Sequence, residues 1–240
     1  PTKAYRAGMP SLVPLEPSLQ YSMGFGVYGR VNGVWPKALV QVPHHSAYNT
    51  ATEHGSFTVS LLYNKTADES YVRTTEYPGL ASSNFVKTLL HKPAMIRIEI
   101  HEPWASSSYM RFAFPNGNLD IPSSKFINFY NSQHLVFARW EVKAVSGGTG
   151  YTGIATVVID GVVMATSSTF YNDVPPVTAV NQPMEIGGTS TASAVLDDRS
   201  TVPTYIDQVA LWARPLKDIE IWRLFKKVWE YQDMVMKKGP

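Results

Sequence analysis

The chain has 240 residues, of which 21 are lysine or arginine and 19 are aspartate or glutamate, so its formal net charge is +2. Hydrophobic residues make up 44%, enough for a sizeable core, whereas charged residues make up only 17%, below the roughly 25% of typical soluble domains. With so little excess charge and no basic run, the composition argues against nucleic-acid binding and against docking on an anionic membrane. The absence of cysteine removes disulfides, thiolate metal sites and cysteine nucleophiles.

Residues 1–24 are expected to form an extended N-terminal arm. Pro10, Pro14 and Pro17 each fix φ and remove a backbone donor, which disfavours a helix. One interpretation is an unanchored terminus. The other is an arm that contacts a neighbouring subunit, since it would otherwise expose four apolar side chains to water. These are Leu12, Val13, Leu15 and Leu19.

Residues 25–215 read as short β segments separated by turns. Residues 56–63 and 95–100 alternate apolar with polar or charged side chains, and the second pattern is typical of a strand with one face in water. Asp160-Gly161 is a strong hairpin signal, because both turn positions need φ > 0. Many strands without intervening helices predict an antiparallel sandwich or jelly roll.

The period changes in residues 216–240, where apolar residues recur at helical spacing. Asp218 and Glu220 lie near the start, where the helix dipole favours negative charge. A helix of about 20 residues should bury its apolar stripe against the sandwich. Trp222 and Trp229 could instead face a partner.

Several short motifs occur in a fixed order along the β region. They are Val40–Pro43 with Ser56–Ser60, His134–Ala138, Val157–Gly161, Met184–Gly187 and Tyr205–Leu216. This ordered set resembles the laminin-G-like, concanavalin-A-like jelly-roll family. The resemblance implies an all-β jelly-roll sandwich, a fold that carries lectins, glycosidases, adhesion modules and virion parts. Three departures are Gln208 in place of an acidic residue, Lys217 in place of a serine cap, and a segment at 65–78 that looks inserted.

Catalysis is not expected. Glycosidases of this fold resemble one another in a Glu-x-Asp-x-x-Glu strand motif, and glycoside hydrolysis needs two facing carboxylates. The nearest candidates, Glu99 and Glu102, are three residues apart and should point to opposite faces of a strand. The glycine-rich stretch at 146–150 precedes no predicted helix, so we interpret it as a hairpin loop rather than a phosphate cradle.

Two kinds of binding site are weighed. Some relatives in the resembled family bind calcium through carboxylates at the sandwich rim, and the candidates here are Asp173, Asp197 and Asp198 on predicted loops. The alternative is that these aspartates are solvated turn residues. No other cofactor is expected. A glycan site would use exposed aromatic rings in loop-like contexts, although such rings can also plug the ends of a sandwich. The aromatic candidates are Trp35, Trp104, Tyr151 and Tyr171. Trp140 and Trp212 fall within predicted strands and are expected in the core.

Two functions remain after these exclusions. The first is a non-catalytic virion component of a tailed bacteriophage, such as a capsid decoration, head-fibre or tail protein. Its partners would be other virion proteins and further copies of the chain. The start of the chain lacks the apolar core of a signal peptide, which fits this hypothesis. The second is a carbohydrate-binding module that recognises surface glycans, located outside the cell or on its surface.

Overall fold

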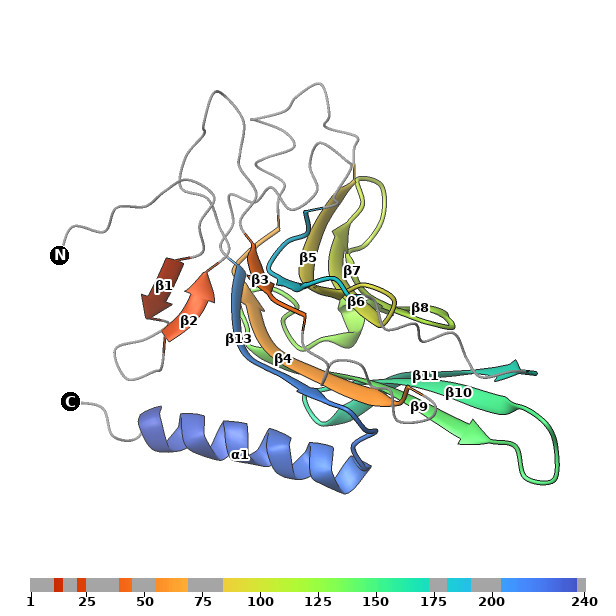
Figure 1. The fold of residues 1–240 in the computed structure, drawn as a ribbon. Helices are drawn as coiled ribbons and strands as arrows, with labels where there is room; N and C mark the ends of the chain where they lie inside the picture. The colour runs from red at the N-terminus through yellow and green to blue at the C-terminus, as the bar shows by residue number, and fades with distance from the viewer. Residues whose placement is uncertain are drawn as a thin grey trace.

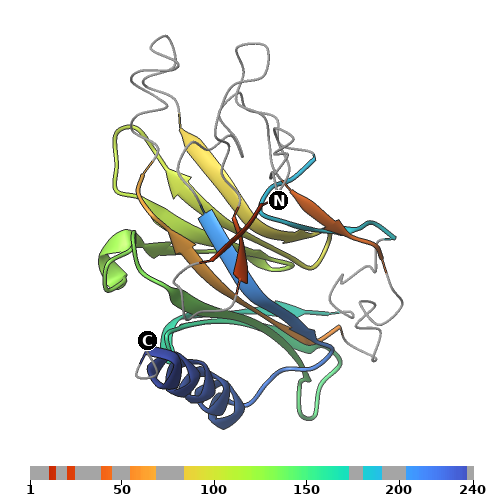
Figure 2. The same ribbon diagram turned by 90° about the vertical axis from the view of Figure 1, so that its left-hand side faces the viewer.

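The computed structural model describes residues 11–14, 21–24, 39–44, 55–68, 84–172, 181–190 and 204–236. Two antiparallel sheets pack face to face, and one long helix lies against the outside of one of them (Figures 1 and 2). The predicted all-β jelly-roll sandwich with a C-terminal helix is therefore confirmed.

The larger sheet has the strand order β1-β2-β13-β4-β9-β10-β11, and the smaller sheet has the order β3-β12-β5-β6-β7-β8. The strands of the larger sheet are β1 (Ser11–Pro14), β2 (Tyr21–Gly24), β4 (Phe57–Lys65), β9 (His134–Ala144), β10 (Tyr151–Ile159), β11 (Val162–Tyr171) and β13 (Thr204–Trp212). Those of the smaller sheet are β3 (Val40–Val42), β5 (Phe85–Lys92), β6 (Ile96–Glu102), β7 (Tyr109–Phe114), β8 (Gly117–Pro122) and β12 (Met184–Ile186). A 3-10 turn, η4 (Ser123–Lys125), follows β8, and the helix is α1 (Asp218–Met236).

The arm predicted at 1–24 contains strands of the larger sheet. β1 pairs with β2, and β2 pairs with β13 of the same chain. Leu12 and Val13 belong to β1, whereas Leu15 and Leu19 lie outside the described residues. Contact of this segment with a neighbouring subunit stays a prediction.

The main core lies between the sheets and follows from strand alternation. Ile96, Ile98 and Ile100 of β6 point into it and are at most 2% exposed. Trp140 is fully buried, as predicted from its place within a strand. Trp212 is different: it is only partly buried and stacks on Phe137 in a second cluster beneath α1. Its expected place in the main core was wrong, because its side chain points to the outer face of the sheet.

Helix α1 covers the outer face of the larger sheet with its apolar stripe, as expected. Between Asp218 and Glu230, the apolar residues of the helix that are buried or half-buried are Ile221, Leu224, Phe225 and Val228. They pack on a cluster from the sheet and the segment before the helix, namely Leu62, Leu135, Phe137, Val158 and Leu216. Trp222 and Trp229 flank the stripe and are 49% and 36% exposed.

The helix begins without a serine cap and uses a carboxylate instead. Glu220 accepts a hydrogen bond of 2.8 Å from the Lys217 backbone N–H and two from the Arg214 guanidinium at 2.6 and 2.9 Å. The hydrogen bonds from Arg214 are the main cause that lowers the pKa of Glu220 to about 2. Thr58 of β4 ties this junction to the sheet, since its hydroxyl accepts from Leu216 N–H at 2.9 Å.

The hairpin signals of the sequence are confirmed. Asp160 and Gly161 have φ values of 51° and 79° and join β10 to β11, as a tight turn with two positive φ angles requires. The Asp160 carboxylate also accepts from Leu135 N–H at 2.9 Å and lies 2.7 Å from His134 Nδ1, which fastens the turn to β9. Residues 146–150 form the loop between β9 and β10.

Candidate functional site

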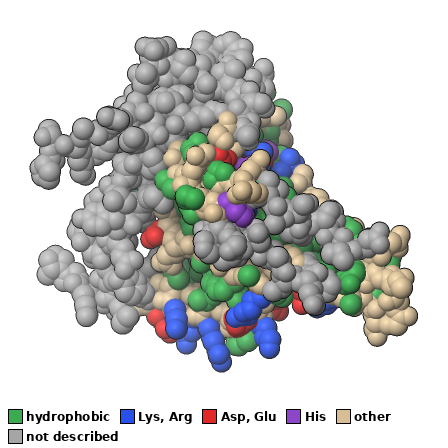
Figure 3. All heavy atoms as spheres, viewed as in Figure 1, with side chains coloured by type: hydrophobic (Ala, Val, Ile, Leu, Met, Phe, Trp, Pro, Cys, Tyr) green, Lys and Arg blue, Asp and Glu red, His purple; other side chains and the backbone are tan. Residues whose placement is uncertain are grey.

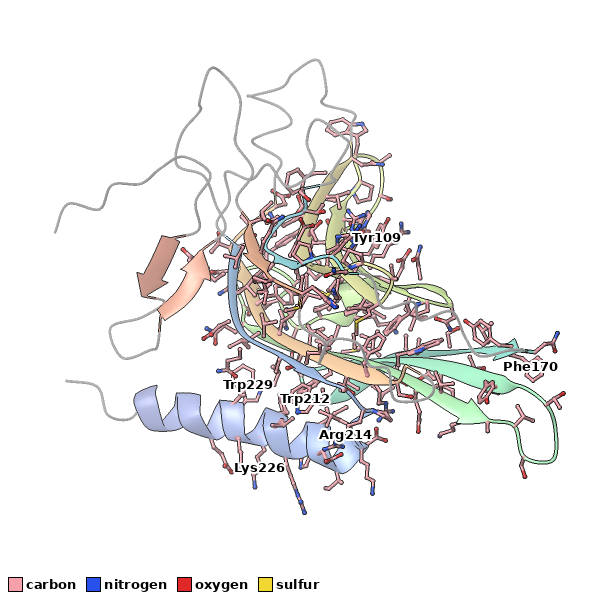
Figure 4. All side chains as sticks on the ribbon, viewed as in Figure 1. Tyr109, Phe170, Trp212, Arg214, Lys226 and Trp229 are labelled. Carbon is pink, nitrogen blue, oxygen red and sulfur yellow. The ribbon has the colours of Figure 1, made fainter. Side chains whose placement is uncertain are left out.

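The outer face of the smaller sheet is polar over its last three strands, and its side chains range from Glu99, which is buried at 5% exposure, to Asp120, whose side chain is 42% exposed. We call this surface the β6–β8 face and define it by the outward-pointing residues Arg97, Glu99 and His101 of β6, Tyr109 and Arg111 of β7, and Asp120 of β8. Alternation creates it, because the residues between them on the same strands are buried or half-buried on the core side. The label of Tyr109 in Figure 4 locates this face, on the smaller sheet and away from α1.

The first row of the β6–β8 face runs along β6. Glu99 forms an ion pair with Arg97, and its Oε2 atom lies 2.8 Å from His101 Nε2. Burial by itself would raise the pKa of Glu99, but the hydrogen bond from His101 and the nearby arginine charges lower it below its ordinary value. The carboxylate is therefore held ionised between two planar cationic or hydrogen-bonding groups.

The second row crosses β7 and β8. Arg111 donates two hydrogen bonds of 2.8 Å to Asp120, one from Nε and one from Nη2. The Tyr109 ring stacks on the His101 ring, with centroids 4.8 Å apart and planes 13° apart, while Arg111 lies 5.3 Å from the Tyr109 centroid. The side chains thus hold one another in fixed orientations, with the guanidinium and carboxylate edges partly exposed to solvent.

A tryptophan stands on the loop beyond this face. Trp104 lies between β6 and β7, the strands that carry His101 and Tyr109, and its side chain is 52% exposed. Its backbone N–H donates to Asn84 Oδ1 at 3.4 Å. Of the three aromatic glycan candidates that the structure describes, Trp104 is the one on a loop that joins two strands of the β6–β8 face.

A buried network anchors the base of the same loop. Glu102, which is 2% exposed, pairs with the fully buried Lys65 at 3.3 Å. The Tyr130 hydroxyl lies 3.1 Å from Glu102 Oε1 and 3.0 Å from Ser108 Oγ at the other end of the loop. Glu102 therefore points into the molecule while Glu99 points out, as alternation predicted, so this pair lacks the facing geometry of a glycosidase.

The polar character continues along the smaller sheet to β12. Glu185 accepts hydrogen bonds from Gln41 Nε2 at 3.0 Å, Thr189 Oγ1 at 2.7 Å and Ser190 Oγ at 2.6 Å. Burial would raise its pKa, but these hydrogen bonds lower it to about 2. His91 lies 3.4 Å from the same carboxylate, and burial lowers the histidine pKa. This cluster ties β3, β12 and β5 together.

The structure brings Tyr151 and Tyr171 together, but away from the β6–β8 face. They are direct cross-strand partners at the open end of β10 and β11. Tyr171 packs against Gly153, where a methyl group would lie 3.1 Å from the tyrosine ring and collide with Trp140. Both tyrosines are half-buried and pack against the main core, which matches their alternative interpretation as plugs of the sandwich end. Phe170, which precedes Tyr171 in β11, faces outward and is 57% exposed (Figure 4).

The remaining predicted site residues are not brought together by the part of the chain that is described. Trp35, Asp173, Asp197 and Asp198 lie outside the described residues, so the calcium site stays a prediction. Among described residues, no cluster of three or more His, Asp or Glu side chains could hold a metal ion.

The exposed side of α1 carries basic side chains, which gather along the helix in Figure 3. They include Arg223, Lys226 and Lys227, and Lys226 points away from the sandwich (Figure 4). Among the described residues, no helix has the length and apolar character needed to span a membrane. A partner for Trp222 and Trp229 stays a prediction.

Sequence reasoning missed Arg111, Tyr109 and Asp120 as site residues. The alternation in β6 indicated that Arg97, Glu99 and His101 share a face, but the neighbours of that strand were unknown. One signal was available. Arg111 and Asp120 lie symmetrically about the Pro115-Asn116 turn, and the sequence Pro-Asn-Gly at 115–117 is typical of a turn.

The fold is shared with solved binding domains. The binding domain of Paraclostridial Mosquitocidal Protein 1 matches with a TM-score of 0.54 at 13% identity, over 91% of this chain and 46% of that one. A structure of botulinum neurotoxin type C, whose cell entry depends on two ganglioside molecules, gives 0.53 at 14% identity, over 92% and 45%. The binding domain of botulinum neurotoxin DC in complex with SialylT gives 0.51 at 16% identity, over 92% and 45%.

These identities establish a common fold and no more. The chain spans about half the length of the structures that it matches. Neither a protein-family model nor a curated protein sequence matches it.

Proposed function

We propose that the chain is a non-catalytic carbohydrate-binding module and that the β6–β8 face, with Trp104 at its rim, is the binding site. The observation that carries this proposal is the array of mutually hydrogen-bonded planar side chains on one sheet face, with an exposed indole on the loop that joins two of its strands. A sugar presents hydroxyl groups around its ring and an apolar face on one or both sides. The array supplies partners for the first feature and Trp104 for the second.

Fixed orientation is what makes the array suitable for recognition. Free arginine and carboxylate side chains would lose rotamer freedom on binding, at a cost of about 0.5–1.5 kcal/mol for each side chain. Here Arg111 is already held by both oxygens of Asp120, and Glu99 is already held by His101 and Arg97. The partly exposed edges of Arg111 and Asp120 keep donors and acceptors for adjacent hydroxyls, whereas the buried Glu99 orients Arg97 and His101.

The charge balance of the face favours neutral sugars. Arg97 is paired with Glu99 and Arg111 with Asp120. An anionic ligand would have to displace a carboxylate that is already bound, whereas a hydroxyl can donate to the carboxylate and accept from the guanidinium at the same time. We therefore propose neutral pyranose residues as the ligand class.

Relatives in fold support a binding role without specifying the ligand. The matched structures are binding domains, and two are described together with gangliosides or with SialylT. A glycan-binding role places the chain outside the cell or on its surface. The virion role predicted from the sequence stays a prediction, since no residue contact of the structure bears on it.

The proposal is tested by screening the purified chain on a glycan array and titrating the strongest neutral ligand by calorimetry. We expect saturable binding that weakens about tenfold or more in Trp104→Ala, since tenfold corresponds to about 1.4 kcal/mol. Ile127→Ala is the control, because Ile127 is 84% exposed and lies outside the face. No saturable binding, or equal affinity of Trp104→Ala and the wild type, would contradict the proposal.

A further inference from the structure

The larger sheet ends in an edge strand with an unusual composition. β11 is last in the strand order, and within the described residues it pairs only with β10 (Figure 1). Over Val162–Tyr171 it carries no charged residue, and Val162, Val163 and Phe170 are 57%, 52% and 57% exposed. Soluble proteins usually protect long edge strands with charges, prolines or covering segments. β11 has a register shift near Val163, and Thr169 Oγ1 accepts a hydrogen bond of 3.3 Å from Asn116 Nδ2 of the smaller sheet, but an uncharged edge of ten residues is suited to pairing with another strand.

The order of side chains along β11 makes it complementary to itself. Two valines begin the strand (Val162, Val163), two aromatic residues end it (Phe170, Tyr171), and hydroxyl side chains fill residues 166–169. An antiparallel pair related by a two-fold axis sets the start of one strand against the end of the other. Valines would then meet aromatic rings at both ends, and hydroxyls would meet hydroxyls in the middle, with no like charges opposed.

Two of the three exposed apolar residues share one face, whereas Val162 lies opposite the core residue Ile159 and points to the inner side. Val163 is opposite Val158, and Phe170 is opposite Thr152, six residues away on the regular strand β10. An even separation places both on the same side of the sheet. That side is the outer one, because Val158 packs in the cluster beneath α1. The register shift near Val163 is what brings this valine to the same face as Phe170.

Helix α1 extends this apolar surface. A methyl group in place of the Gly161 hydrogen would lie 3.0 Å from the Phe225 ring and 3.2 Å from the Trp222 ring. The half-exposed Trp222 therefore lies beside the turn that starts β11, next to Val162 and Val163. A second strand laid along β11 with its Phe170 at this end would meet an apolar surface formed by both the edge and the helix.

We propose that two copies of this chain associate through antiparallel pairing of their β11 strands, which joins the two larger sheets into one continuous sheet. A second copy is the occupant that the strand itself specifies, because its pattern is symmetric about its centre and it has no charge with which to select a charged partner. Trp222 is the residue of α1 that we expect to contact Phe170 of the partner subunit.

The experiment measures mass by light scattering over a range of concentrations, and we expect the wild type to reach twice the chain mass of 26.7 kDa. Thr166 is exposed near the centre of β11, so Thr166→Lys and Thr166→Glu each bring two like charges close together on either side of the axis. Both variants should be folded by circular dichroism and should have the mass of one chain by light scattering. An equal mixture of the two should recover the doubled mass, because Lys then lies near Glu.

The matched control is Asn118→Lys, which adds the same charge to an exposed position of β8, the edge of the smaller sheet. It should keep the doubled mass. A wild type with the mass of one chain at every concentration would overturn the proposal. So would a doubled mass that Thr166→Lys leaves unchanged, or a mixture of the Lys and Glu variants that stays monomeric.

Discussion

The two outer faces of the sandwich differ in how they meet solvent. On the larger sheet, Phe137, Leu62 and Val158 point outward and are buried only because α1 covers them. On the smaller sheet, the outward residues that define the β6–β8 face are charged or polar, and they form ion pairs and hydrogen bonds with one another. The first face is held by burial of apolar area, and the second by directional contacts.

This difference assigns separate roles to the two faces. Removing apolar area from water contributes roughly 25 cal/mol per Å² to folding. The face beneath α1 therefore stabilises the fold only while the helix covers it. A partly exposed ion pair such as Arg111–Asp120 contributes about 0–1 kcal/mol, so this part of the β6–β8 face adds little to stability while keeping polar groups oriented. That combination is what a preformed recognition surface needs.

The largest effect is expected from removing a ring beneath the helix. Phe137→Ala should lower the free energy of unfolding by about 3–5 kcal/mol, because the side chain is 1% exposed and its loss leaves a cavity under α1. Ile127→Ala is the control, since the loss of a side chain that is 84% exposed should cost less than about 1 kcal/mol. Urea unfolding followed by circular dichroism measures both, and equal losses would contradict the account of this face.

A carboxylate on the smaller sheet should give the next largest effect, and it should depend on pH. The pKa of Glu185 is lowered from 4.5 to about 2 in the folded chain, so its contribution is complete above about pH 4.5 and is lost as the pH falls towards 2. Glu185→Gln should cost on the order of 2–3 kcal/mol at pH 7 and should flatten the stability profile across that window. The control is Glu230→Gln, at an exposed site on α1, which should leave the stability profile unchanged. Identical profiles for the two variants would contradict the stabilising role of the hydrogen bonds to Glu185.

An intermediate effect is expected at the flank of the helix. Trp229 is 36% exposed and contacts the Phe225 ring edge-on at 5.9 Å. A core tryptophan would cost about 3–5 kcal/mol on truncation, but Trp229→Ala should cost only about 1–2 kcal/mol because much of the ring already meets solvent. The same urea unfolding measures it, and a loss as large as that of Phe137→Ala would place Trp229 inside the covered face.

The smallest change in stability is expected on the β6–β8 face, together with a large change in binding. Asp120→Asn should alter the free energy of unfolding by less than about 1 kcal/mol, since the Asp120 side chain is 42% exposed. It should nevertheless weaken binding of the array-selected sugar about tenfold, because the Arg111 guanidinium loses its bidentate partner and its fixed orientation. Calorimetry on the folded variant measures this. Full affinity, or a loss of stability as large as that at Glu185, would remove the contrast between the faces.

More of the fold than of the candidate site could be predicted from the sequence. Strand alternation, the Asp160-Gly161 turn and the helical period after Leu216 are local signals, and each sets a local structure. The register between β6 and β7 is not local, so the meeting of His101 with Tyr109 could not be predicted from their spacing. Trp212 was misplaced for a related reason: strand periodicity indicates which residues share a face, but not which face a later helix will cover.

The most direct test of the central claim is to map the bound sugar by NMR, following the backbone amide shifts of the labelled chain during titration with the strongest neutral ligand from the array. We expect the largest shifts in β6, β7, β8 and the loop that carries Trp104, with little change in α1 and at the open end of β10 and β11. Shifts concentrated around Tyr151 and Tyr171, or along α1, would show that the sugar binds elsewhere and would contradict the assignment of the β6–β8 face.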